Sequence, residues 1–300
     1  MSDTKPALSE IAEKQNDETS LRYQLAKAYF YTRAKWLYVL GTALTVALAL
    51  AAPLVLLFAP GAGPKLGAIA GLWIFVARLA LEPLRNRFQL RGAIAQECFD
   101  CRVLSLPWNE ALARRLPDEE ISAARRVASR SERRVRQARD WYAADVELTW
   151  PRSVLICQRS NAVWACRQHR AYGWVVVVAA VAWAVIGVVV AVADSASLGV
   201  YLVTIALPSL PAFLDASDLF RAHSAASRAR ELLRDQGDAL VEEGNADVHD
   251  LREIQDQLFH LRRDAPQVPE WFYNVVRPSY EEDMKYAVEQ TAERFEGTSK

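Results

Sequence analysis

The chain has 300 residues, of which 52% are hydrophobic and 24% charged, and its formal net charge is zero. That length allows two domains of ordinary size, and four cysteines are too few for a disulfide-stapled secreted scaffold. The zero net charge averages over a strong segregation, because charged residues are almost absent from 36–83 and 171–214 and dense elsewhere. Long uncharged apolar stretches are typical of membrane spans.

The N-terminal 35 residues are polar and lack the short apolar core that a secretion signal needs, so we expect no such signal. Residues 8–36 contain no Gly or Pro, which favours one helix running directly into a membrane span. The expected first span is 36–59, within a run of 29 uncharged residues between two lysines. Residues 66–83 are expected to return across the bilayer after the turn-forming run Pro60-Gly61-Ala62-Gly63-Pro64.

A second pair of spans is predicted at 171–193 and 196–214, joined by a short polar link. The first of these runs has 23 residues without a charge, and another 20 separate Asp194 from Asp215. A helix rises about 1.5 Å per residue, so about 20 apolar residues cross a hydrocarbon core about 30 Å thick. The alternative is a buried hairpin of a large soluble protein. However, soluble helices normally keep a polar stripe, and 172–193 has none.

The positions of Lys and Arg predict the orientation of both hairpins. Of 36 such residues, only Lys65 lies in an expected external loop. By the positive-inside bias, both termini (1–35 and 215–300) and the middle segment (84–170) are expected in the cytoplasm. The four cysteines fall in these segments, so free thiols are expected in that reducing compartment.

The middle segment is too long to be an unstructured loop. Pro117, followed by three acidic residues, predicts a helix to about residue 141, and a helix starting after Pro151 is expected to continue into the third span. The tail predicts a continuation of the fourth span to Glu243, a helical stripe from Val248 to Leu261, and a last helix starting at Pro278. The expected fold is therefore all-α and polytopic, with one cytoplasmic helical domain built from the head, middle and tail.

Several residues in or near the spans are candidates for a pore or gate. Arg78 and Glu82 lie four residues apart and can pair on one helix face, either at a gate or with Arg78 reaching the headgroups. Pro208 and Pro211 are expected to kink or loosen the fourth span. Beyond them, acids that either line an inner mouth or remain solvated at a helix end are Asp215 and Asp218.

Small residues in the first hairpin can let membrane helices approach closely. Gly67 and Gly71 form a G-x-x-x-G pattern, which serves either packing within one chain or assembly of several chains. Because four packed helices enclose side chains rather than a channel, a pore requires several subunits or a rearrangement. A homo-oligomer is therefore expected.

A run of seven arginines within 121–140 is the strongest charged feature, and we single out Arg126, Arg130, Arg133 and Arg134. Arginine forks bind phosphates in a bidentate manner. Three targets remain open: anionic lipid headgroups, a nucleotide messenger, or the acidic tail of the same chain.

Cys98 and Cys101 form a C-x-x-C pattern that Cys157 and Cys166 can complete as a metal site, but the spacing supports zinc weakly. No phosphate-cradling glycine loop, H-E-x-x-H or G-x-S-x-G pattern occurs. We therefore expect neither an enzyme nor a cofactor, and DNA binding is not expected.

Four groups of residues, one in the head, two in the middle segment and one in the tail, together resemble the SMODS-associated four-transmembrane effector family. The first group includes Gln15-Asn16 and Tyr31–Lys35, and the second includes Phe99-Asp100 and Pro107-Trp108-Asn109. The third includes Trp141-Tyr142 and Cys157–Asn161, and the fourth includes Ile254-Gln255-Asp256 and Pro269–Tyr273. The resemblance covers nearly the whole chain, and it depends on the order of these groups around a two-plus-two arrangement of spans. The family has no agreed catalytic residues to transfer.

The resemblance implies a pore-forming effector of bacterial antiphage defence. Such effectors are associated with cGAS-like nucleotidyltransferases that make cyclic oligonucleotides on infection. The expected partners are therefore the lipid bilayer and either a cyclic oligonucleotide or a protein of a neighbouring nucleotidyltransferase system. The main alternative is a non-conducting membrane scaffold that recruits a cytosolic partner, and a membrane-anchored enzyme is a third possibility.

Overall fold

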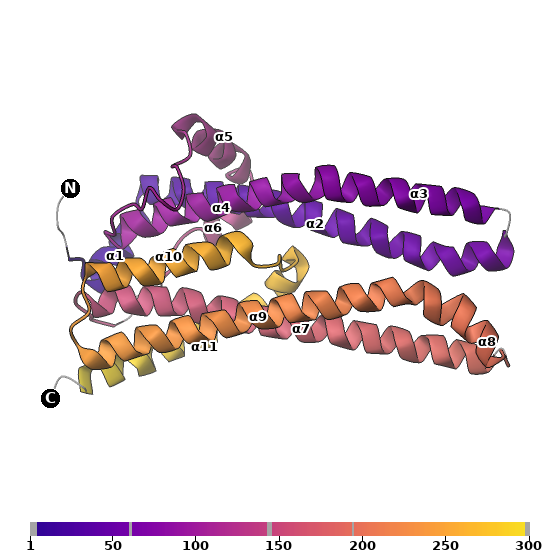
Figure 1. The fold of residues 1–300 in the computed structure, drawn as a ribbon. Helices are drawn as coiled ribbons and strands as arrows, with labels where there is room; N and C mark the ends of the chain where they lie inside the picture. Colours follow the sequence, from indigo (N-terminus) through magenta and orange to yellow (C-terminus); the bar gives the residue numbers. More distant parts are fainter. Residues whose placement is uncertain (1–4, 60–61, 143–145, 194, 298–300) are drawn as a thin grey trace.

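The structure is a computed structural model that describes residues 5–59, 62–142, 146–193 and 195–297. Every regular element in those ranges is a helix, as the sequence predicts. Two helical hairpins extend side by side in one direction, and a thicker helical body lies at the opposite end, near both termini (Figure 1). We refer to this thicker end as the helical body.

The first hairpin pairs α2 (Glu18–Phe58) with α3 (Gly63–Val76) and α4 (Glu82–Val103), which a π-helical turn at Ala77–Leu81 connects. The indole N–H of Trp73 donates to the Thr45 hydroxyl at 3.0 Å, across the two arms. Because lipid offers no hydrogen bonds to a polar group, such a contact helps to hold the two arms together.

The second hairpin pairs α7 (Arg152–Ala193) with α9 (Leu207–Glu243). Before α9 come α8 (Leu198–Tyr201) and a second π-helical turn at Leu202–Ala206. The expected helix that continues through α7 into the third span is present. The indole N–H of Trp183 donates to the Ser209 hydroxyl at 3.1 Å, so this pair of arms is also bridged in its apolar part.

Apolar side chains cover the outer halves of both hairpins, and Leu72, Val178 and Val192 are 67%, 64% and 74% exposed. Among the described residues, two helical stretches are long and apolar enough to cross a membrane, Lys65–Val103 and Arg152–Ala193. In the most apolar 18 residues of each stretch, 0% and 6% of the residues are buried. These helices are therefore not the core of a soluble protein, and the chain associates with a membrane. The four-span layout stays a prediction.

The glycines of the G-x-x-x-G pattern have no close neighbour among the described residues. A Cβ added at Gly67 or Gly71 would meet no described atom within 4 Å, whereas one at Gly41 would meet Leu81 at 2.9 Å. Close approach within the first hairpin therefore uses Gly41. No described side chain covers the two glycines of the G-x-x-x-G face, which can therefore serve contact with another chain.

The helical body also contains α1 (Leu8–Lys14), α5 (Asp118–Ala128), α6 (Glu132–Gln137), α10 (Val248–Asp264) and α11 (Glu270–Gly297). Its largest apolar cluster joins α1, α4, α7, α9 and α10, and includes Leu8, Phe99, Leu155, Leu233 and Ile254. Residues from the head, middle and tail of the chain thus pack into one apolar cluster.

Three helix boundaries differ from the expectation. The N-terminal helix is interrupted where the Asp17 carboxylate accepts the Ser20 amide at 2.7 Å, starting α2. The helix expected over 118–141 is two helices, because the Ser131 side chain caps α6. The last helix starts at Glu270, directly after Pro269, and not at Pro278, which lies inside it.

Candidate functional site

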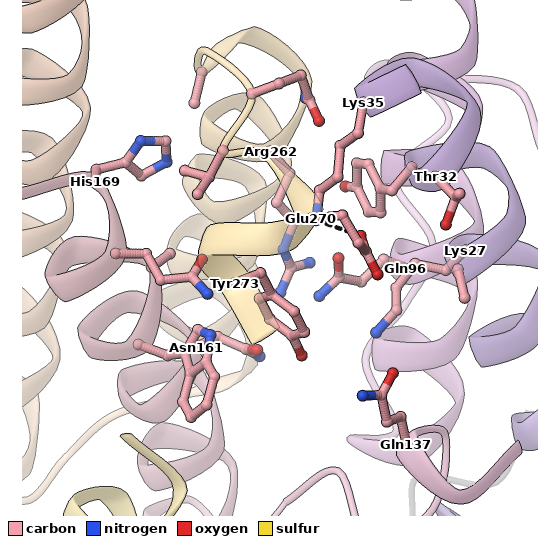
Figure 2. Close-up of a pocket in the computed structure, with 18 of the residues that line it drawn as sticks. Lys27, Thr32, Lys35, Gln96, Gln137, Asn161, His169, Arg262, Glu270 and Tyr273 are labelled. Carbon is pink, nitrogen blue, oxygen red and sulfur yellow. Dashed lines mark hydrogen bonds and ion pairs between the residues drawn. The ribbon is translucent and has the colours of Figure 1, made fainter. Parts of the chain in front are cut away.

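A cavity of about 250 Å³ lies in the helical body, where α2, α7 and the α10–α11 connection meet. Figure 2 shows Lys27 and Gln96 on one side of it and Asn161 and Tyr273 on the other. The lining is drawn from all three polar segments of the chain. Residues between 24 and 35 come from α2, those between 134 and 141 from α6 and the loop after it, those between 161 and 169 from α7, and those between 230 and 273 from the tail.

Positive charge dominates the lining of this cavity, which we call the cationic cavity. Among the described residues of the lining, Glu270 supplies the one carboxylate, against five cationic side chains: Lys27, Lys35, Arg134, Arg230 and Arg262. Glu270 accepts from Lys35 at 3.2 Å (Figure 2), and Arg262 binds the buried Asp100 carboxylate at 2.6 Å. The remaining excess of positive charge favours an anionic ligand.

Lys27 is the most unusual of these cations. Its side chain is buried, its amine has no hydrogen-bond partner among the described residues, and it lies 3.3 Å from the centre of the Trp141 ring. Burial holds the pKa of this amine well below its usual value, because desolvation outweighs the attraction of Asp100. An anionic ligand beside Lys27 would restore the pairing that a buried ammonium requires.

Other buried polar groups of the lining also lack a hydrogen-bond partner in the described part of the chain. They are both amide atoms of Gln24, the Tyr31 hydroxyl and the Gln168 amide nitrogen. Buried polar atoms in native proteins are nearly always bonded, so a cluster of unbonded ones indicates a site for a polar ligand or water. Amides and hydroxyls of this kind can read the edges of a nucleobase.

Aromatic rings form part of the same wall. The rings of Trp164, on α7, and Tyr273, on α11, lie 6.4 Å apart. The Trp141 ring lies against the Lys27 amine. Flat aromatic faces beside cationic groups are the elements that stack nucleobases and hold their phosphates.

A second groove of about 430 Å³ adjoins the cationic cavity, since Gln137 lines both. We call it the outer groove. It lies between α6 and α11. Its lining includes Arg133, Arg136, Asn274 and Arg277, and no acid is among the described residues that line it. An anionic ligand larger than the cavity can therefore extend along a continuous basic surface.

The cationic cavity reaches the junction between the helical body and the apolar hairpins. Val268 lines the cavity. Together with Phe272, it packs against Tyr172, which lies at the start of the third apolar run. The Tyr172 and Phe272 rings are 5.3 Å apart. His169 also lines the cavity, and its Nδ1 lies 2.8 Å from Nδ1 of His223 on α9. Residues of the cavity lining thus contact both arms of the second hairpin, α7 and α9.

The structure divides the four arginines that the sequence singles out. Arg134 lines the cationic cavity, and Arg133 lies at its rim, where it is 3.6 Å from the Glu270 carboxylate and donates to Asn274. Arg126 and Arg130 are exposed on or just after α5, and neither lines the cavity or the outer groove.

The candidates for a pore or gate lie along the hairpins rather than at the cavity. Arg78 donates to Glu82 at 3.2 Å, in the π-helical turn and the residue after it, and its side chain is 74% exposed. Asp218 is paired with Arg221, and Asp215 is exposed. The prolines of the fourth span, Pro208 and Pro211, lie in the first turns of α9, directly after a π-helical turn.

The four cysteines are buried and free. Burial raises the pKa of the Cys98 thiol to about 12, which keeps it protonated and unreactive. The thiol of Cys166 contacts the Ser227 hydroxyl at 3.2 Å, and its neighbour along the helix, His169, pairs with His223 instead. No group of three potential metal ligands occurs within the described ranges.

Comparison with known families decides which group of proteins shares this arrangement. A family model described as the SMODS-associating 4TM effector domain matches residues 9–291. The chain belongs to this family. A protein of Bacillus cereus (strain VD146), named a "probable CBASS effector molecule", is similar to this 4TM effector. The two are 23% identical over 288 residues, which cover 91% of this chain and 95% of the relative. No solved structure matches this chain.

The motif residues of this 4TM effector that are far apart in the sequence converge on one buried polar network beside the cavity. The Asp100 carboxylate accepts from Tyr142 at 2.7 Å, from Gln255 at 2.9 Å and from Arg262 at 2.6 Å. Asn161 donates to the Tyr142 hydroxyl at 2.9 Å. This network fixes the position of Arg262 on the cavity wall. The sequence marked Asp100, Tyr142, Asn161 and Gln255 only by resemblance, since nothing local to each one shows that they meet.

Proposed function

We propose that this 4TM effector acts in antiphage defence at the bacterial inner membrane, and that a cyclic oligonucleotide bound in the cationic cavity switches it to a membrane-disrupting state. Membership of an effector family supports the role, and so does the similarity to a relative named a CBASS effector. The observation that carries the choice of ligand is the cavity itself, in which cationic, amide and aromatic side chains converge.

The size of the two basic hollows favours an oligonucleotide over a single nucleotide. Sites for small ligands span about 300–1,000 Å³, so a cavity of about 250 Å³ is small for a whole messenger. The cavity and the outer groove of about 430 Å³ together fall within that range. One base would stack at Trp164 and Tyr273, while phosphates would bind Arg134 inside and Arg133 and Arg136 outside.

The predicted topology brings the cavity to the side where such a messenger is made. Because 35 of 36 Lys and Arg residues lie outside the predicted external loops, the helical body is expected on the cytoplasmic face. Four apolar segments, 36–59, 66–83, 171–193 and 196–214, would then span the inner membrane. A cytosolic nucleotide would reach the cavity without crossing the bilayer.

Signal transfer would use the contact of Val268 and Phe272 with Tyr172. A ligand that displaces the start of α11 would change the packing of α7 against α9, and with it the arrangement of the second hairpin. Pore formation then needs several chains, for which the open Gly67/Gly71 face provides a helix–helix contact. Arg78, Glu82, Asp215 and Asp218 remain the candidates to line or gate that opening.

Isothermal titration of the full chain in lipid nanodiscs with a panel of cyclic di- and trinucleotides tests the proposed site. At least one member should bind, and Arg134→Gln should weaken that binding about tenfold or more, since it removes a charged hydrogen bond. Arg126→Gln is the matched control, because this exposed arginine of the same basic run lies outside both hollows. Absence of binding by every member, or equal loss in the two variants, would count against the cavity as the receptor.

A further inference from the structure

Glu270 occupies an unusual position between the two basic hollows. Its carboxylate accepts from Lys35 at 3.2 Å and lies 3.6 Å from the guanidinium of Arg133. Lys35 belongs to the lining of the cationic cavity, whereas Arg133 lines the outer groove. Glu270 therefore bridges one cation from each hollow, and it is the one carboxylate among the described residues of either lining.

The partners of Glu270 are those that a phosphate prefers. A lysine and an arginine provide charge-assisted donors, and Glu270 is the first residue of α11, where a helix leaves amide groups unbonded and carries partial positive charge. A carboxylate and a phosphate use such donors in the same way. The two anions would therefore compete for one position.

The competition is weak enough to be reversed by a ligand. The side chains of Glu270, Arg133 and Lys35 are 42%, 50% and 18% exposed, and ion pairs with an exposed partner contribute little to stability. A ligand that also stacks on Trp164 and pairs with Lys27 gains binding energy that the Glu270 carboxylate alone does not have.

We propose that the Glu270 carboxylate marks a phosphate subsite between Lys35 and Arg133, and that it holds this subsite in the resting protein until a ligand phosphate displaces it. The inference rests on the proposed function for the identity of the natural ligand, but the subsite itself can be tested with inorganic phosphate. Displacement would release the first turn of α11, which carries Phe272 against Tyr172 at the base of the second hairpin. Glu270 would thus act as an internal competitor.

Thermal unfolding of the detergent-solubilised full chain, titrated with potassium phosphate against potassium chloride of equal ionic strength, tests the subsite. Removing the competing charge with Glu270→Gln should lower the phosphate concentration for half-maximal stabilisation about tenfold, which corresponds to about 1.4 kcal/mol. Adding Arg133→Gln to that variant should abolish the gain. Glu289→Gln, an exposed acid farther along α11, should behave as the wild type.

Glu270→Asp provides a second variant that keeps the acid at the start of α11 and shortens it by one methylene. Its phosphate response should fall between those of the wild type and Glu270→Gln. Equal phosphate responses of the wild type and Glu270→Gln, or a gain that survives Arg133→Gln, would overturn the subsite. Failure of every cyclic oligonucleotide to bind the wild type would instead refute the proposed function, so the two failures can be told apart.

Discussion

Lys27→Met should stabilise the ligand-free protein while it weakens nucleotide binding. The Lys27 amine is buried without a hydrogen-bond partner among the described residues, so its burial costs about 1–3 kcal/mol. Its contact with Trp141, at 3.3 Å, returns about 1–2 kcal/mol as a cation–π interaction. Methionine is similar in length to lysine, and a contact between its sulfur and the Trp141 ring would recover about 1 kcal/mol of the lost cation–π interaction. The net expectation is a gain of about 1 kcal/mol.

Thermal unfolding followed by circular dichroism measures this gain, and about 1 kcal/mol corresponds to a rise of roughly 2–4 °C in a domain of this size. Lys5→Met is the control, because Lys5 lies 4.2 Å from the Trp150 ring in an exposed position. It should change the melting temperature little. A loss of stability in Lys27→Met, together with unchanged affinity for the nucleotide, would refute the view that Lys27 is kept for a ligand.

The pH dependence of stability provides a second signature of Lys27. Because its pKa is lower in the folded protein than the value of 10.5 for an unfolded chain, the unfolded state binds more protons between these two pKa values. The free energy of unfolding therefore rises with pH across that window. Lys27→Met should lose this part of the slope, whereas Lys5→Met should retain it.

Three further predictions concern the cavity wall and its connection to the hairpins. Trp164→Ala, which removes a stacking surface, should weaken cyclic oligonucleotide binding by about 1–3 kcal/mol in a titration, while Trp164→Phe should lose less. The pKa of His223 is lowered to about 4 by burial, so stability should fall by up to about 3 kcal/mol as pH drops from 6.5 towards 4, and His223→Gln should flatten that part of the pH profile in thermal unfolding. Phe272→Ala should cost about 3 kcal/mol of stability and leave ligand binding in place. In liposomes that contain the protein, it should reduce the dye release that the ligand triggers. Unchanged release would contradict coupling through Tyr172.

The sequence predicts the long helices well, because their signals are local. An uncharged run after Arg170 indicates where α7 becomes apolar, and Gly244, with a φ of 71°, ends α9 where the sequence places a break. Boundaries set by single hydrogen bonds were predicted less well. Ser131 caps α6 within a stretch that has helical composition throughout, so composition alone does not reveal the interruption.

The candidate site could be predicted only in part. The run of arginines points to an anionic ligand, and Arg133 and Arg134 do lie at the cavity. Lys27 could not be found in this way, because it lies in a helix whose composition is of mixed charge and its partner Trp141 is more than 100 residues away. Only tertiary packing shows that the amine is buried and unpaired.

Dye release from proteoliposomes tests the central claim most directly. The full chain is reconstituted around a self-quenched dye, and cyclic di- and trinucleotides are added from the side on which the helical body is exposed. We predict that one of them triggers release from the wild type and from Arg126→Gln, and that Arg134→Gln needs about tenfold more of it. Vesicles that stay sealed with every nucleotide, or equal release from Arg134→Gln, would contradict the account.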